Sequence, residues 1–216
     1  MSKNFKNRFY TSIILLSLLF FMIKSNLMMG YILLILSIIS LIEFNNMLLI
    51  IFNKEKIKRL FINMLFTIYI FLFIYFFWTF SFYTHLKILT YVILITCIAS
   101  DIGGYIFGKI FGGKKLTRIS PKKTISGAVG SLILSSFSIL IIIFYLTNNL
   151  NLYTILIGTF CSIGCQVGDI FFSYMKRKSF LKDTGNILPG HGGVLDRIDG
   201  ILFGVPIGFL SLYIFY

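Results

Sequence analysis

The feature that most constrains this chain is a succession of seven apolar stretches, each close to the length that a membrane-spanning helix requires. A helix needs about 20 predominantly apolar residues to cross the hydrocarbon core of a bilayer. The stretches comprise residues 9–23, 27–52, 60–80, 88–107, 126–146, 152–172 and 201–216. They predict an all-α fold, a polytopic bundle of about seven transmembrane helices.

The composition excludes an ordinary soluble protein. Apolar residues make up 57% of the 216 residues and charged residues only 12%. Soluble domains contain about 45–50% apolar and about 25% charged residues. One globular core of this size could not hide so much apolar surface behind so few charges. The same balance argues against a disordered chain, a coiled coil and a collagen.

The basic residues are distributed unevenly among the connections. Eighteen of the 20 Lys and Arg residues fall in the N-terminal segment or in the connections 53–59, 109–123 and 173–198. Only Lys24 and Lys87 lie in the other connections. If all seven stretches span, the four basic segments share one face, which the positive-inside rule assigns to the cytoplasm. We therefore expect a multi-pass protein of the cell inner (plasma) membrane with its N-terminus and long loops in the cytoplasm, and the net charge of +13 does not call for a nucleic-acid partner.

Three cysteines, Cys97, Cys161 and Cys165, all lie in apolar stretches. An odd number of cysteines without paired loop spacing argues against a disulfide framework. Cys161 and Cys165 also lack the neighbouring ligands of a zinc site. We expect the three side chains to act as small apolar packing residues.

Two aspartates lie in apolar surroundings, Asp101 in CIASDIGGYIFG and Asp169 in CQVGDIFFSYMKRK. A carboxylate inside a bilayer costs about 2.5–3.5 kcal/mol even on a lenient insertion scale, so it needs a partner, a cavity or a cation. Pairing with a nearby lysine is the plain alternative, and Lys109 and Lys114 are available to Asp101. Both aspartates are candidate site residues.

The connection 173–198 and the residue after it combine a basic cluster, a glycine-rich turn and an Asp-Arg-Ile-Asp run. Glycine permits close backbone approach to a phosphate, and Lys and Arg supply charge-assisted donors. Asp196 and Asp199 would share one face of a helical turn, and magnesium suits one or two carboxylates plus substrate phosphates. Asp169 precedes the point where its stretch leaves the membrane, on the face where Asp196 begins the next stretch, so the two can meet at one cytoplasmic cavity.

Residues 112–127 form a second segment that is rich in glycine and lysine. It is not a P-loop, because the G-x-x-x-x-G-K-[ST] spacing is absent. Taken alone, such a basic loop would only set the orientation of the protein in the membrane. Beside intramembrane acids and a second loop of the same kind, it predicts another site for phosphate.

The sequence from Ser173 to Asp199 reads S-x2-K-R-x4-K-D-x-G-x2-L-P-x-H-G-G-x2-D-R-x-D. This pattern resembles the signature of the phosphatidate cytidylyltransferase (CDP-diacylglycerol synthase) family. S-D-x2-G-Y-x2-G from Ser100 and S-P-K-K-T from Ser120 are similar to two further family motifs, in the same order. The likeness covers residues 95–205. The chain departs from the family at Ser126, where a glutamate is usual, at Gly104, where alanine is common, and in its shorter N-terminal half.

The resemblance implies transfer of CMP from CTP to phosphatidic acid, giving CDP-diacylglycerol and pyrophosphate. It implies that Asp169 and Asp196 hold Mg²⁺ with Asp199 close by. The candidate catalytic residues are Asp169, Asp196, Lys176, Arg177, His191 and Arg197. The candidate substrate-binding residues are Asp101, Ser120, Lys122, Lys123, Thr124, Ser173, Lys182, Asp183, Gly192 and Gly193. For His191 we favour shaping the turn or donating a hydrogen bond over proton transfer.

On this interpretation residues 1–86 hold N-terminal membrane helices, and residues 87–216 form a catalytic membrane domain with cytoplasmic loops 109–125 and 173–198. The expected partners are CTP, phosphatidic acid and the lipid bilayer. A homodimer is left open.

Two alternatives predict different chemistry. A CTP-dependent lipid kinase, of the kind that acts on polyprenols, would pass one phosphate to an alcohol and would need a base near that hydroxyl. An ion-coupled transporter would use the intramembrane acids as ion sites, but the inverted repeats and broken helices typical of carriers are not evident in the sequence.

Overall fold

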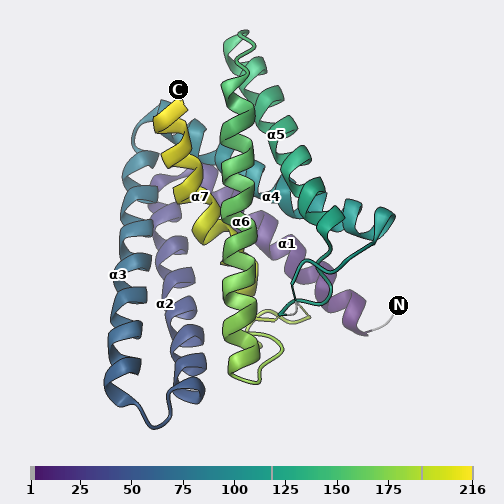
Figure 1. The fold of residues 1–216 in the computed structure, drawn as a ribbon. Helices are drawn as coiled ribbons and strands as arrows, with labels where there is room; N and C mark the ends of the chain where they lie inside the picture. The colour runs from purple at the N-terminus through teal and green to yellow at the C-terminus, as the bar shows by residue number, and fades with distance from the viewer. Residues whose placement is uncertain (1–2, 118, 191, 216) are drawn as a thin grey trace. The chain divides into compact units, whose positions relative to one another are not determined.

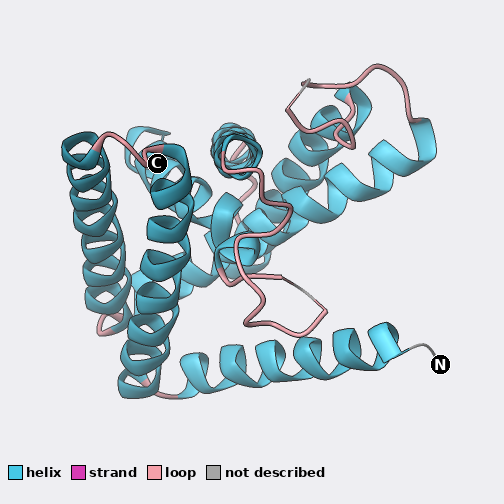
Figure 2. Ribbon diagram, turned by 90° about the horizontal axis from the view of Figure 1, so that it is seen from below, coloured by secondary structure: helices cyan, strands magenta, loops and turns pink. Residues whose placement is uncertain are grey.

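The computed structural model consists of helices joined by short connections and two longer loops (Figures 1 and 2). It describes residues 3–117, 119–190 and 192–215, with side chains from residue 10 onward. The helices are α1 (Lys3–Lys24), α2 (Asn26–Ile51), α3 (Lys56–Ser81), α4 (Thr84–Phe111), α5 (Ile125–Thr147), α6 (Tyr153–Lys178) and α7 (Leu195–Phe215). Within these ranges the only β-structure consists of isolated bridges in the two loops, which confirms the all-α prediction.

Six of the described helices, α2 to α7, are long and apolar enough to cross a membrane. The apolar part of α1, Tyr10–Lys24, is shorter than the roughly 20 residues that a span requires. The chain is therefore a multi-pass membrane protein, and α1 is the candidate span that falls below full length. Its N-terminal end diverges steeply from α2 (Figures 1 and 2).

The helices that carry candidate site residues extend beyond their apolar stretches. α6 continues past residue 172 through the basic cluster to Lys178, and α7 begins at Leu195 rather than near 201. Cations are favourable in the last turn of a helix and anions in the first, because the peptide dipoles align along the axis. Lys176, Arg177 and Lys178 lie in the last turn of α6, and Asp196 lies in the first turn of α7.

The chain forms two compact units, Met1–Leu86 with Met175–Ile198, and Lys87–Tyr174 with Asp199–Tyr216. The functional division into residues 1–86 and 87–216 stays a prediction. The segment 175–198, which the sequence analysis placed with residues 87–216, belongs to the first unit. Hydrogen bonds from this segment to a carboxylate on α2 explain the grouping, as described below.

In the first unit, α2 and α3 lie side by side (Figure 1). The rings of Phe44 on α2 and Phe66 on α3 stack with their centroids 3.9 Å apart. Met47 and Leu48 of α2 are fully buried. This apolar packing surrounds the one turn of α2 that carries a buried acid, Glu43.

In the second unit, small residues let helix backbones approach closely, as is common between membrane helices. A Cβ on Gly127 of α5 would lie 2.8 Å from the carbonyl oxygen of Gly104 on α4. A Cβ on Gly164 of α6 would lie 3.0 Å from Cα of Gly204 on α7. These approaches bring α5 close to α4, which carries Asp101, and bring the part of α7 after Ile198 close to α6, which carries Asp169.

Candidate active site

In the second unit, a cavity of about 270 Å³ gathers side chains from three separate sequence motifs. Asp101 lines it from α4, Lys122 and Lys123 from the loop before α5, and Asp169 from α6. Thr124, at the N-cap of α5, lines it as well. The sequence analysis named all five as site residues, and the structure brings them together. Ser120 lies in the same loop but is not among the described residues that line the cavity.

Asp169 is bound to the loop by a lysine 46 residues earlier in the chain. Nζ of Lys123 donates to Oδ2 of Asp169 at 2.5 Å, and the two side chains are 30% and 24% exposed. The other carboxylate oxygen, Oδ1, faces α7, where a Cβ on Gly200 would lie 3.2 Å away. A partly exposed pair of this kind contributes only about 0.2–1 kcal/mol, so a phosphate can compete for Lys123 and a cation for Asp169.

Asp101 lines the same cavity as Asp169. The ion pairs described in the structure do not include one between Asp101 and Lys109 or Lys114, and the Lys109 ammonium lies 5.7 Å from the ring centroid of Tyr105. The cavity is therefore lined by two aspartates and by two lysines, Lys122 and Lys123. Such a balanced set can accept a phosphate together with a cation.

Backbone hydrogen bonds fold the loop before α5 back on itself. The Leu116 N–H donates to the Lys123 carbonyl at 2.8 Å, and the Ile125 N–H donates to the Lys114 carbonyl at 3.0 Å. The loop departs from α4 through Gly112, whose φ of 57° falls in the region that glycine adopts most readily. The fold of this loop sets the position of Lys122 and Lys123.

Ser126 closes the same loop through a chain of hydroxyl groups. Its Oγ donates to the carbonyl of Gly112. Since that uses its only proton, the 3.0 Å contact between Thr124 and Ser126 must have Thr124 Oγ1 as the donor. Thr124 Oγ1 in turn accepts from the Gly127 N–H at 3.1 Å and so caps α5. Ser126, at the position where the family usually has a glutamate, thus holds the loop to α5.

In the first unit, Asp196 is held on both oxygens. Lys176 Nζ donates to Oδ1 at 2.6 Å, and the two side chains are 14% and 7% exposed. Oδ2 accepts from the backbone N–H groups of Thr184 at 2.8 Å and Gly193 at 3.0 Å. The Thr184 hydroxyl lies 3.1 Å from the same oxygen. Charge-assisted bonds of this kind are among the strongest in proteins, so Asp196 is fixed more firmly than Asp169.

Glu43, which is only 2% exposed, was not among the site residues predicted from the sequence. Its Oε1 accepts from the Val194 N–H at 3.0 Å, and its Oε2 accepts from the Leu195 N–H and the Thr184 hydroxyl, both at 2.8 Å. The signal was present, because Glu43 stands in the apolar run SLIEFNNMLL. Like Asp101 and Asp169, an acid in such an apolar stretch needs a partner.

The other predicted site residues are divided between the units. Ser173 and Asp199 lie in the second unit, and Arg177, Lys182, Asp183, Gly192 and Arg197 lie in the first. Their roles toward a substrate stay predictions. His191 lies outside the described residues. Because Asp169 and Asp196 belong to different units, their meeting at one cavity also stays a prediction.

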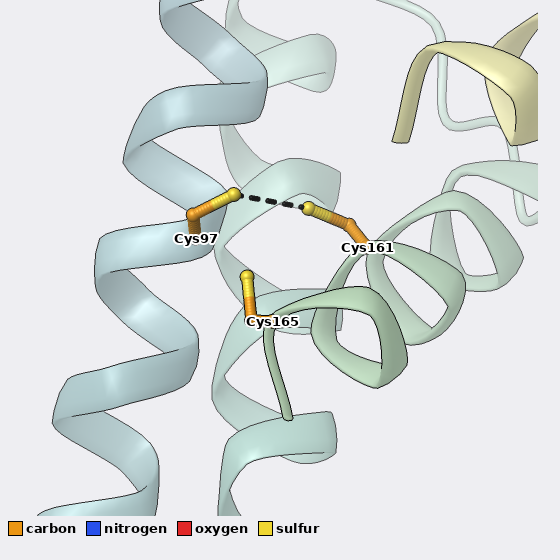
Figure 3. Close-up of side chains that lie close together, drawn as sticks. All are labelled: Cys97, Cys161 and Cys165. Atoms are coloured by element: carbon orange, nitrogen blue, oxygen red, sulfur yellow. Dashed lines mark hydrogen bonds between the residues drawn. The ribbon is translucent and has the colours of Figure 1, made fainter. Parts of the chain in front are cut away.

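The three cysteines of the second unit point toward one another from α4 and α6 (Figure 3). All are buried free thiols, and the Sγ atoms of Cys97 and Cys161 are 3.5 Å apart. A Cβ on Gly204 of α7 would lie 2.9 Å from Cys97 Sγ, so α7 covers the cluster. This burial agrees with the predicted packing role. The three sulfur atoms lie within 4.8 Å of one another, but no fourth Cys, His, Asp or Glu among the described residues joins the group.

Comparison with known proteins gives a family match and several curated relatives. Residues 2–215 match the family described as the cytidylyltransferase family, which extends the likeness beyond residues 95–205 into the N-terminal helices. A phosphatidate cytidylyltransferase of Staphylococcus haemolyticus is 43% identical over 124 residues, covering 56% of this chain and 47% of the relative. That of Bacillus subtilis is 41% identical over 133 residues, which cover 59% of this chain and 49% of the relative. That of Rickettsia bellii is 41% identical over 128 residues, which cover 55% of each chain. The chain spans about half the length of the curated relatives it matches.

Proposed function

Because the chain belongs to the cytidylyltransferase family, we propose that it is a phosphatidate cytidylyltransferase. It would transfer CMP from CTP to phosphatidic acid and release pyrophosphate. Relatives that carry this name are 43% and 41% identical to the chain over 124 and 133 residues. The single observation that carries the proposal is the cavity in which Asp101, Lys123 and Asp169 meet, each from a different motif.

The chemistry of the reactants explains why such a cavity suits this reaction. CTP and phosphatidic acid are both strongly anionic, so their approach requires fixed positive charge. Lys122 and Lys123 supply it at the mouth of a cavity in a bundle of membrane helices. The lipid substrate can remain in the bilayer while its phosphate reaches these groups.

We propose Mg²⁺ as the cofactor, held by Asp169 and Asp196 with Asp199 close by. The donor set fits, since carboxylate oxygens are the hard ligands that magnesium prefers. Each of the first two carboxylates already attracts a cation, Lys123 at 2.5 Å from Asp169 and Lys176 at 2.6 Å from Asp196. When bound, the ion would neutralise charge on the substrate phosphates.

The chain's own residues then have to position the reactants. A phosphate oxygen of phosphatidic acid attacks the α-phosphorus of CTP, a new P–O bond forms, and the bond from that phosphorus to the pyrophosphate oxygen breaks. The nucleophile is already an anion, so the step needs no strong base. Lys122 and Lys123 would bind phosphate oxygens, and Lys176, Arg177 and Arg197 would neutralise the remaining charge.

We infer that both site loops face the cytoplasm, where CTP is available. The connections 53–59, 109–123 and 173–198 carry 15 of the 20 basic residues and alternate with connections that carry few. This count does not depend on whether α1 spans the membrane. A homodimer stays a prediction.

Purified protein in detergent or nanodiscs, supplied with CTP, phosphatidic acid and Mg²⁺, tests the proposal. We expect CDP-diacylglycerol and pyrophosphate in equal amounts, and no product with a chelator. If the protein phosphorylates a lipid alcohol and leaves phosphatidic acid unchanged, it is the CTP-dependent lipid kinase of the alternative.

A further inference from the structure

We propose that Glu43 on α2 is a positioning residue. It holds Thr184 and the start of α7, where Asp196 lies, in place for the reaction. This inference rests on the proposed function. It assigns to the N-terminal helices, whose sequence shows little beyond apolar character, a direct part in building the site. All the contacts that support it lie within the first unit.

Glu43 satisfies backbone groups at the start of α7. The first N–H groups of a helix have no acceptor within the helix. Val194 and Leu195 stand at the start of α7, and their N–H groups donate to Oε1 and Oε2 of Glu43 at 3.0 and 2.8 Å. A negative charge at this position also complements the helix dipole. The carboxylate of α2 therefore acts as the cap of a helix that begins about 150 residues later.

Two motif glycines leave the space that this carboxylate occupies. A Cβ on Gly185 would lie 2.6 Å from Oε1 of Glu43, and a Cβ on Gly193 would lie 2.6 Å from both carboxylate oxygens. Any side chain at either position would have to displace Glu43 or the loop. The sequence analysis assigned Gly193 to phosphate contact, whereas in the structure its Cα faces Glu43 and its N–H donates to Asp196.

Thr184 links the two carboxylates directly. Its single hydroxyl group lies 2.8 Å from Oε2 of Glu43 and 3.1 Å from Oδ2 of Asp196. A hydroxyl has one proton to donate, so the two acids share it. The Thr184 backbone N–H donates to the same Asp196 oxygen. A change at Glu43 is thus transmitted to Asp196 through one residue.

The donor set explains why a carboxylate and not an amide fits at position 43. Both oxygens face donors: the Val194 N–H on Oε1, and the Leu195 N–H and the Thr184 hydroxyl on Oε2. Glutamine would turn its NH2 toward a backbone N–H and leave one donor unpaired in a buried place. Aspartate would keep the charge but retract it by one methylene.

The test compares Glu43→Gln with a matched control, Glu55→Gln, in the full chain. Glu55 is a half-exposed residue that pairs with Lys58 at the surface. We expect Glu43→Gln to accelerate backbone amide exchange in residues 184–197, with exchange in α5 unchanged. We also expect kcat to fall about tenfold or more, which equals about 1.4 kcal/mol, with KM for CTP changed by less than about threefold. Glu55→Gln should match the wild type in both measurements.

Two further variants keep the test decisive if Glu43→Gln does not fold. Glu43→Asp should restore part of kcat, and Thr184→Val, which removes only the shared hydroxyl, should lower kcat and accelerate exchange in the same segment. Unchanged exchange in residues 184–197, or unchanged kcat in folded Glu43→Gln or Thr184→Val, would overturn the inference. The exchange readout does not require turnover, so a wild-type protein without cytidylyltransferase activity would refute the proposed function separately.

Discussion

At the scale of single residues, the acids Asp169, Asp196 and Glu43 differ in how firmly they are held. Asp169 has one partly exposed lysine partner. Asp196 is nearly buried and bonded on both oxygens. Glu43 is 2% exposed and accepts only from neutral donors among its described hydrogen bonds. Asp169 can therefore exchange its partner for a ligand more easily than Asp196 can.

Replacing either aspartate by asparagine should abolish turnover while insertion and expression stay normal. Asparagine keeps the shape but removes the charge that would hold the cation. The two variants should differ in stability. Asp196→Asn leaves Lys176 charged in a nearly buried place, where breaking a pair costs up to about 3–5 kcal/mol, whereas Asp169→Asn disturbs a partly exposed pair. Product formation and Tm of the purified variants measure both effects, and more than a few per cent of wild-type activity in either would contradict the roles assigned.

Lys123→Ala should raise the apparent KM for CTP or phosphatidic acid. A hydrogen bond to a charged group is worth about 1.5–3 kcal/mol, so the change should be about tenfold or more. Lys54→Ala is the matched control, because it also removes one positive charge, from the exposed connection between α2 and α3. Initial rates over a matrix of the two substrate concentrations give the answer. If Lys123→Ala has the same kinetic constants as the wild type, the loop does not bind substrate and serves only to orient the protein in the membrane.

At the scale of elements, the site depends on how closely α4 approaches α5. A Cβ on Gly104 would lie 2.7 Å from Oγ of Ser131, which is 5% exposed. The alanine that is common at this position in the family would therefore conflict with this serine. Substitutions at positions 104 and 131 are expected to be coupled, so that the effect of one on stability depends on the other.

A double-mutant cycle tests this packing. Gly104→Ala should lower Tm in the wild-type background, because the clash with Ser131 outweighs the gain of about 1 kcal/mol in helix propensity. In the Ser131→Ala background the same substitution should be neutral or stabilising, with a coupling of about 0.5–3 kcal/mol. Additive effects on Tm would show that the two helices are not held in the contact described.

The helices also show which parts of the fold could be predicted from the sequence. Apolar stretches predicted the helices, because the bilayer forces every backbone group to be satisfied within a helix. Their ends were missed at α6 and α7, where charged residues continue the helix by favourable interaction with its dipole rather than by hydrophobicity. As a result, Lys176 was expected in a loop and lies in the last turn of α6.

At the scale of the whole molecule, the sequence predicted that residues 87–216 hold the chemistry, and the role proposed for Glu43 adds a residue of the N-terminal helices. The acid in α2 was visible as a charge in an apolar run, but its partners are 141 to 152 residues away. Nothing in periodicity or spacing selects partners at that separation. The pairing of Lys123 with Asp169 was hidden for the same reason, although both residues were expected in the site.

The most direct measurement follows two labels of CTP into the lipid fraction. The protein is incubated with phosphatidic acid and Mg²⁺, with CTP labelled either in the α-phosphate or in the γ-phosphate. The account predicts that the α-label enters the lipid and that the γ-label is released as pyrophosphate. Label from the γ-phosphate in the lipid, with none from the α-phosphate, would contradict cytidylyl transfer.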